Sequence, residues 1–253
     1  MQKNNKTISN IFVKKISEKW NSLMTKSELE KIWVRAGGSL SRFSFALNLL
    51  KNHNLLTRVA KDCYYLGDAE NLDFLYWKIV DKIVGLYASS AIIAWEKALE
   101  WQMMNQMPPE KLVIFTQDFS ARIRLFDNRE IYFRTISAGE RSGGKNLFSM
   151  LKKFTTKNEN FKNLRFFSKE ISLLEALSVH EKNAWTNEVL ILQFLQRYHE
   201  KLDTEIFSQI AKYRYIRALN RLRVISKEQN FQKLYEKILE IIKKDGAGCF
   251  VSF

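Results

Sequence analysis

Apolar side chains recur along the first part of the chain at the spacing of α-helices. Ile8, Ile11 and Phe12 stand at i, i+3 and i+4, which predicts a long first helix. Thr25 is followed three residues later by Glu28. This is the spacing of a capping box, in which each side chain bonds the other residue's backbone N–H. A second helix is therefore predicted to begin at this point.

A pair of glycines, Gly37-Gly38, is expected to end the second helix, because glycine readily adopts the positive φ angles at which helices stop. Ser39 follows and is expected to cap a third helix. Apolar residues at i, i+3, i+7 and i+10 of that helix predict its buried stripe, which is Leu40, Phe43, Leu47 and Leu50. The third helix should therefore have one buried side and one side that faces solvent.

Residues 55–66 predict a small hairpin, with two short strands around the turn Ala60-Lys61-Asp62. The order helix, helix, turn, helix, hairpin is that of a winged helix-turn-helix. We therefore expect a domain of this kind at residues 1–68. A second domain is expected at residues 71–253.

The second domain is predicted to begin with helices and to continue with strands. Residues 71–107 predict two helices, the second with Ala91 and Trp95 on one side. Three strand-like runs follow, at residues 112–116, 121–126 and 130–136.

The last two of these runs predict a hairpin whose register follows from its apolar pattern. A three-residue loop, Asp127-Asn128-Arg129, places Leu125 opposite Ile131 and gathers the apolar side chains on one face. The same register places Arg122 opposite Arg134. Like charges in that position repel each other unless an anion or an acidic partner lies between them.

The rest of the chain is predicted to be mostly helical. Residues 137–169 are looser and basic, with a turn at Ser142-Gly143-Gly144, and helices follow at residues 173–178, 188–199, 206–224 and 231–244. The predicted fold class is α+β. It consists of an N-terminal winged helix-turn-helix and a mixed, mostly helical domain with a small antiparallel sheet.

The composition, and above all the charge, indicates which class of partner this protein binds. The 253 residues include 41 Lys and Arg against 27 Asp and Glu, a net charge of +14, and 46% are hydrophobic. So large a hydrophobic fraction argues against disorder, and the positive balance indicates a polyanionic partner. Residues 1–70 alone hold 12 Lys and Arg against 6 Asp and Glu. A composition bias with evenly spread charge is the alternative.

Several classes of protein are excluded at this stage. The longest apolar run, residues 83–95, is shorter than the roughly 20 residues that a membrane-spanning helix needs. The N-terminus lacks the apolar core of a signal peptide, so a cytoplasmic protein is expected. Cys63 and Cys249 form no CxxC pair, and the three histidines are scattered, so no metal site is expected. No cofactor motif is present either.

The solvent-facing side of the third helix is the first candidate site. Arg reads guanine in a major groove, Asn reads adenine, and a hairpin turn adds cations near the phosphates. The predicted DNA-binding residues are Ser39, Ser41, Arg42, Phe45 and Asn48, with Arg58 and Lys61 on the wing. The alternative is a protein-docking module whose basic faces bind an acidic partner.

A second basic surface is the next candidate. Residues 206–227 contain no acidic residue, and three arginines at i, i+3 and i+7 share one helix face. Such a stripe suits phosphates or carboxylates, although a solvated cationic helix fits equally well. The candidate residues are Arg122, Arg124, Arg134, Lys152, Lys153, Lys212, Arg214, Arg217, Arg221 and Arg223.

Catalysis finds little support in the sequence, and we expect a protein that is not an enzyme. The segment Gly37-Gly38-Ser39 is superficially similar to the loop that opens a nucleotidyltransferase site. That chemistry needs carboxylates soon afterwards to hold Mg²⁺, and none occurs before Asp62. The acids of a hypothetical nuclease show no supporting spacing: Asp118, Asp127, Glu130 and Glu170.

Five runs along the chain together form a recognisable pattern: residues 45–56 (FALNLLKNHNLL), 59–66 (VAKDCYYL), 87–91 (YASSA), 112–116 (LVIFT) and 166–177 (FFSKEISLLEAL). On these runs, most of the chain resembles the AbiEi-type antitoxins of type IV toxin–antitoxin (abortive infection) systems. The chain departs from that family at the wing, where Asp62-Cys63 stands in place of the usual Arg-Gly.

The resemblance implies an autorepressor that binds double-stranded operator DNA through the winged helix, as a monomer or a dimer. It further implies an antitoxin whose C-terminal domain counters a nucleotidyltransferase toxin. The partner of that domain is then the toxin or the toxin's RNA target.

Overall fold

The protein has an α+β fold with two compact units. The computed structural model describes residues 2–68, 70, 72–88, 90–117, 119–136, 147–178 and 188–245. Unit one consists of Met1–Tyr87 and Arg122–Ile131, and unit two of Ala88–Ala121 and Tyr132–Phe253. The sequence placed the domain boundary between residues 68 and 71. Unit one instead continues through one more helix, to residue 87, and includes residues 122–131 from later in the chain.

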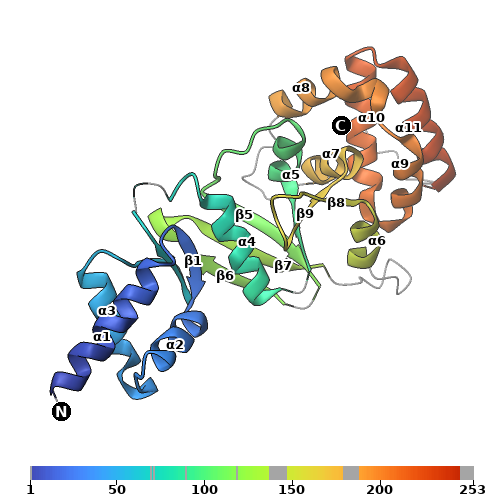
Figure 1. Cartoon of the computed structure of the whole chain (residues 1–253). Helices are drawn as coiled ribbons and strands as arrows, with labels where there is room; N and C mark the ends of the chain where they lie inside the picture. The colour runs from blue at the N-terminus through green and yellow to red at the C-terminus, as the bar shows by residue number, and fades with distance from the viewer. Residues whose placement is uncertain are drawn as a thin grey trace. The chain divides into compact units, whose positions relative to one another are not determined.

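In its described part, unit one combines helices with a three-stranded antiparallel sheet of order β1-β3-β2. Figure 1 labels its helices α1 to α4 and the strand β1. Strand β1 was not expected from the sequence, since it is too short to show a period. The elements are α1 (Gln2–Ser17), β1 (Ser22–Thr25), α2 (Lys26–Arg35), the 3-10 turn η1 (Leu40–Arg42), α3 (Phe43–Asn52), β2 (Thr57–Ala60), β3 (Cys63–Leu66) and α4 (Tyr76–Tyr87).

The core of unit one forms where the apolar faces of its first three helices meet. Phe12 of α1 packs edge-on against Trp33 of α2, with ring centroids 5.2 Å apart. Leu50 of α3 is fully buried in the same cluster. The capping box at the start of α2 is present as predicted: Glu28 N donates to Thr25 Oγ1 at 3.1 Å, and Thr25 N donates to Glu28 Oε2 at 2.7 Å.

Unit two is built on a six-stranded sheet of order β6-β7-β5-β4-β9-β8, and the tip of the β6–β7 hairpin is grouped with unit one. Strand β4 runs antiparallel to β5 and parallel to β9, so the sheet is mixed and not antiparallel as expected. Its elements are β4 (Ala91–Ile93), α5 (Trp95–Gln102), β5 (Lys111–Thr116), β6 (Ala121–Arg124), β7 (Glu130–Thr135), α6 (Leu147–Lys153), β8 (Thr155–Lys157) and β9 (Leu164–Phe167).

Helices form the rest of unit two. Helix α7 packs on α5 and α10, and α11 packs on α10. These elements are α7 (Lys169–Ser178), α8 (Glu188–Tyr198), α9 (Thr204–Ile210), the π-helical segment η6 (Ala211–Tyr215), α10 (Ile216–Glu228) and α11 (Gln232–Asp245). The sequence predicted one helix over residues 206–224, whereas η6 divides this stretch.

The expectation of two helices over residues 71–107 was wrong, because a strand lies between α4 and α5. Ala91 belongs to this strand, β4, and its register pairs it with Thr116 of β5. Trp95, the first residue of α5, has a φ of 56°. This left-handed conformation is uncommon for a bulky side chain and separates the strand from the helix.

The β6–β7 hairpin has the predicted buried face but not the predicted register. Ile123, Leu125 and Ile131 are all buried, as the apolar pattern indicated. However, Leu125 N donates to Arg129 O at 2.7 Å, which places these two residues opposite each other. The loop is therefore Phe126–Asn128, the 3-10 turn η3, and not residues 127–129. The turn expected at residues 142–144 lies outside the described residues.

Candidate nucleic-acid interface

The outer side of η1 and α3 carries the residues that were expected to read DNA. Arg42, Phe45 and Asn48 are exposed, with Phe45 60% accessible, and Ser39 and Ser41 are exposed beside them. The opposite side of α3 is buried through Phe43, Ala46, Leu47 and Leu50. The packing of this side into the core fixes which residues of α3 face solvent.

Two expectations about the start of this helix were wrong. Leu40 was assigned to the buried stripe but is 65% exposed, because the 3-10 geometry of η1 turns it away from the core. Ser39 was expected to cap the helix, but its side chain makes no capping bond. Its Oγ lies 3.1 Å from Ser41 Oγ instead.

The turn between α2 and η1 is fixed by the indole of Trp33. Trp33 Nε1 donates to Ser39 O at 2.8 Å, and Gly37 has a φ of +93°, as a helix stop requires. This turn borders a cavity of about 500 Å³, which α1 and α3 also line. The lining residues are Ile8, Ser9, Trp33, Gly37, Gly38, Ser39, Arg42 and Phe45.

The β2–β3 hairpin is present where it was predicted, and its two cations are exposed. Arg58 Nε donates to Ala60 O at 3.3 Å, and Lys61 lies in the turn. Asp62 supports this turn with a φ of 57°. Cys63 is fully buried, and burial raises the pKa of its thiol to about 11. Cys63 therefore belongs to the core of the hairpin.

The β6–β7 hairpin presents Arg122 and Arg124 on its outer face. Both face Glu130, whose side chain is nearly buried: Arg122 forms a short ion pair with it, and Arg124 Nε lies 3.6 Å from Glu130 Oε1. The predicted placement of Arg122 opposite Arg134 was wrong, because the observed register shifts the pairing by one step, and the acidic partner of Arg122 is Glu130. Arg134 instead places its guanidinium 4.9 Å from the ring centroid of Trp95.

The other candidates for a second basic surface lie on α6 and along η6 and α10. Lys152 and Lys153 are exposed at the end of α6, and Arg217 is exposed on α10. Burial, and then the charge of Arg217, lower the pKa of Arg221. The side chains of Lys212 and Arg214 lie outside the described part of the chain.

One of the arginines on α10 is held by unit two itself. Arg221 donates from Nη1 to Leu177 O at 2.5 Å, and Arg223 is half-buried. The ten cations thus divide between the two units, with Arg122 and Arg124 in unit one and the others in unit two.

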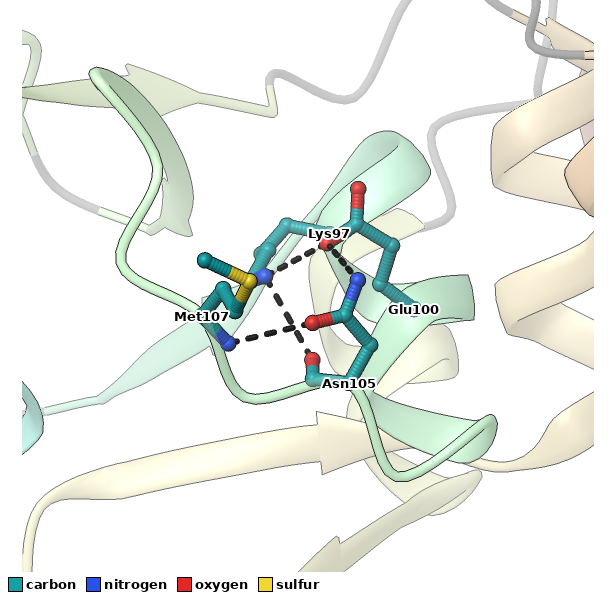
Figure 2. Close-up of polar contacts among 4 residues, drawn as sticks. All are labelled: Lys97, Glu100, Asn105 and Met107. Carbon is teal, nitrogen blue, oxygen red and sulfur yellow. Dashed lines mark hydrogen bonds and ion pairs between the residues drawn. The ribbon is translucent and has the colours of Figure 1, made fainter.

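Sequence reasoning missed a buried lysine on α5. Lys97 is only 7% exposed, and its Nζ donates to Glu100 Oε2 at 2.5 Å and to Asn105 O at 3.4 Å (Figure 2). Asn105 Oδ1 in turn accepts from Met107 N at 3.2 Å. This network holds the loop after α5. The i, i+3 spacing of Lys97 and Glu100 was the only available signal.

Among the described residues, no group of three or more His, Cys, Asp or Glu side chains could hold a metal ion. In the same part of the chain, no helix combines the length and the apolarity that crossing a membrane requires. Glu130 and Glu170 of the hypothetical nuclease have structural contacts. Glu130 faces two arginines, and Glu170 Oε1 accepts from Asp203 N at 3.0 Å.

The comparisons with known proteins identify a similar fold and no family. No family model and no curated protein matches the chain. Among solved structures, the chain is similar to the RV2827C protein from Mycobacterium tuberculosis, with a TM-score of 0.54 and 15% sequence identity. The match covers 91% of this chain and 81% of that one. At this identity the likeness concerns the fold alone.

Proposed function

We propose that this protein binds duplex DNA through unit one, with α3 as the element that enters the major groove. The observation that carries this proposal is the division of α3 into two sides. Phe43 and Leu47 are buried, whereas Arg42, Phe45 and Asn48 are exposed. Arg and Asn are the side chains best suited to read guanine and adenine, and an apolar side chain suits a thymine methyl group.

The order of elements in unit one supports a winged helix-turn-helix as the DNA-binding module. Helices α2 and α3 follow each other across the Gly37-Gly38 turn, and the β2–β3 hairpin comes directly after them. In this interpretation the hairpin is the wing, and Arg58 and Lys61 approach the phosphate backbone. Both side chains are exposed.

We further propose that the protein is an autorepressor and the antitoxin of a type IV toxin–antitoxin system, which opposes a nucleotidyltransferase-like toxin. The support is the resemblance to AbiEi-type antitoxins over residues 45–56, 59–66 and 166–177. These runs include Phe45 and Asn48 of α3 and most of α7. Unit two is then the part that counters the toxin.

The DNA-binding proposal is tested by fluorescence anisotropy on the duplex immediately upstream of the protein's own gene. We expect affinity to fall steeply with salt, because each phosphate contact releases counterions. Arg42→Ala should weaken binding to this duplex by about 5- to 150-fold and reduce discrimination against unrelated duplexes.

Arg197→Ala is the matched control, since Arg197 is an exposed arginine on α8 of unit two. It should leave the affinity within about twofold of wild type, because Arg197 belongs to unit two and not to the proposed DNA-binding surface of unit one. Tight binding that neither salt nor Arg42→Ala changes would contradict the proposal.

The antitoxin proposal is tested by co-expression with the open reading frame next to this gene. We expect that frame to encode a nucleotidyltransferase-like protein that stops growth, and the wild-type chain should restore growth. Arg42→Ala should also restore growth while failing to repress a reporter fused to the upstream DNA, because the two activities lie in different units. An absence of rescue by the wild-type chain would contradict the proposal.

A second candidate function is docking of an acidic protein to unit one, which the exposed apolar side chains favour. Leu40 and Phe45 are both more than half exposed, and Phe45 lines the cavity of about 500 Å³. Exposed apolar groups beside a concave surface are typical of protein-binding sites. Recovery of one stoichiometric acidic partner, together with no shift of any duplex, would favour docking over DNA binding.

A further inference from the structure

The β6–β7 hairpin adjoins the predicted wing although the two are far apart in the sequence. An isolated antiparallel bridge joins Ala60 at the end of β2 to Leu125 at the end of β6. Lys61 directly follows Ala60 in the chain, and Arg124 directly precedes Leu125. The bridge therefore brings the turn of one hairpin close to the end of β6 in the other.

Specific contacts with α4 and the preceding turn fix the hairpin in this place. Arg129 forms a short ion pair with Asp73, and its guanidinium lies 5.7 Å from the ring centroid of Tyr76 and 5.4 Å from that of Phe126. Leu125 is buried on the inner face. A segment that is both ion-paired and packed has a defined position beside β2 before any ligand arrives.

The outer face of the hairpin carries more positive than negative charge. Two guanidiniums, those of Arg122 and Arg124, face the single carboxylate of Glu130. The Glu130 side chain is 9% accessible, whereas those of Arg122 and Arg124 are 55% and 77% accessible. The acid thus lies beneath the two cations and orients them, and solvent meets mainly the arginines.

We propose that the β6–β7 hairpin is a second wing, through which Arg124 contacts a DNA phosphate next to the phosphates bound by Lys61 and Arg58. Guanidinium forks suit phosphate oxygens, and such contacts fix the position of the protein without reading the sequence. This inference rests on the proposed DNA binding of unit one. It extends the interface from the segment 39–61 to a hairpin more than 60 positions away.

The test is Arg124→Ala in the full-length chain, with Kd measured at several salt concentrations on the upstream duplex and on an unrelated duplex of equal length. We expect the same loss on both duplexes, about 10-fold at 50 mM salt, and a salt slope smaller by about 0.9. Arg124→Lys keeps the charge and should keep the slope. Adding Lys61→Ala should reduce the slope by about 0.9 once more.

Arg197→Ala again serves as the control for loss of one exposed arginine, and a thermal melt of each variant checks folding. If Lys61→Ala lowers the slope and Arg124→Ala does not, the second wing is wrong and DNA binding by unit one stands. A loss confined to the upstream duplex would also overturn it, because phosphate contacts carry no sequence preference. If the wild-type chain binds neither duplex, the proposed function itself fails.

Discussion

The space that a side chain on Gly38 would need is already occupied by the indole of Trp33. A β-carbon at this position would lie 2.0 Å from Trp33 Cε2, and Trp33 is nearly buried in the core of unit one. We therefore expect Gly38→Ala to destabilise unit one by about 1–3 kcal/mol, the usual cost of overpacking. Urea unfolding followed by circular dichroism measures this change.

Ser39→Ala is the control for Gly38→Ala, since Ser39 is exposed and its side chain does not cap the helix. It should change the free energy of unfolding by less than about 0.5 kcal/mol. Equal stability of Gly38→Ala and wild type would mean that Trp33 moves aside easily. The packing of Trp33 against Gly38 would then not be what holds the turn before Arg42 in place.

At Gly37 and Gly38 the sequence predicted the end of the helix but not the separate roles of the two glycines. Both glycines were interpreted as one helix stop. In the structure only Gly37 has the positive φ, while Gly38 is needed because an aromatic ring approaches it. A close approach depends on a side chain packed from another direction, and no local pattern records it.

The start of α2 is the element whose stability should depend most clearly on pH. Burial alone would raise the pKa of Glu28, but hydrogen bonds from Thr25 and Lys82 and the charge of Lys82 outweigh it and lower this pKa below its ordinary 4.5. Lys82 Nζ lies 2.9 Å from Glu28 Oε1. A depressed folded-state pKa contributes stability above pH 4.5 that is lost as the pH falls through the lowered value.

We expect Glu28→Gln to remove this pH dependence below about pH 4.5 while it lowers stability near neutrality. Thr25→Ala removes the other half of the capping box and should cost about 1 kcal/mol at pH 7. Guanidinium unfolding at pH 3, 4.5 and 7 measures both variants. Parallel pH profiles for wild type and Glu28→Gln would show that this carboxylate is not responsible.

At the scale of elements, the sequence pattern failed to predict a short strand and the register of a hairpin. Ala91–Ile93 is a three-residue apolar run, and a run this short fits a buried helix as well as a strand. Its pairing with β5 and β9 decides the matter. The β6–β7 faces followed from alternation, but the register differed by one step because the Phe126–Asn128 turn was not recognisable.

The candidate site was likewise predictable from the sequence only in part. The outer residues of α3 followed from helical period, since burial of one side determines the other. The neighbourhood of Arg124 and Lys61 did not, because a bridge between Ala60 and Leu125 joins segments far apart in the chain. Net charge indicated a basic protein, and only the tertiary pairing shows which cations share a surface.

At the scale of the whole molecule, the division into two compact units leads us to expect two separable stabilities. Leu50 is fully buried in the core of unit one, and Phe207 is fully buried in α9 of unit two. Leu50→Ala removes packing atoms from the first core only and should cost about 2–5 kcal/mol there, whereas Phe207→Ala should cost about 3–5 kcal/mol in the second.

Amide hydrogen exchange read by mass spectrometry distinguishes the two effects. Leu50→Ala should speed exchange in α2, α3 and α4 and leave α10 and α11 near their wild-type rates, and Phe207→Ala should do the reverse. The 122–131 hairpin is the informative peptide, because its anchors Asp73 and Tyr76 belong to unit one. It should follow Leu50→Ala. If this peptide instead follows Phe207→Ala, the hairpin is a part of unit two that merely touches the wing, and its arginines have no fixed place beside Lys61.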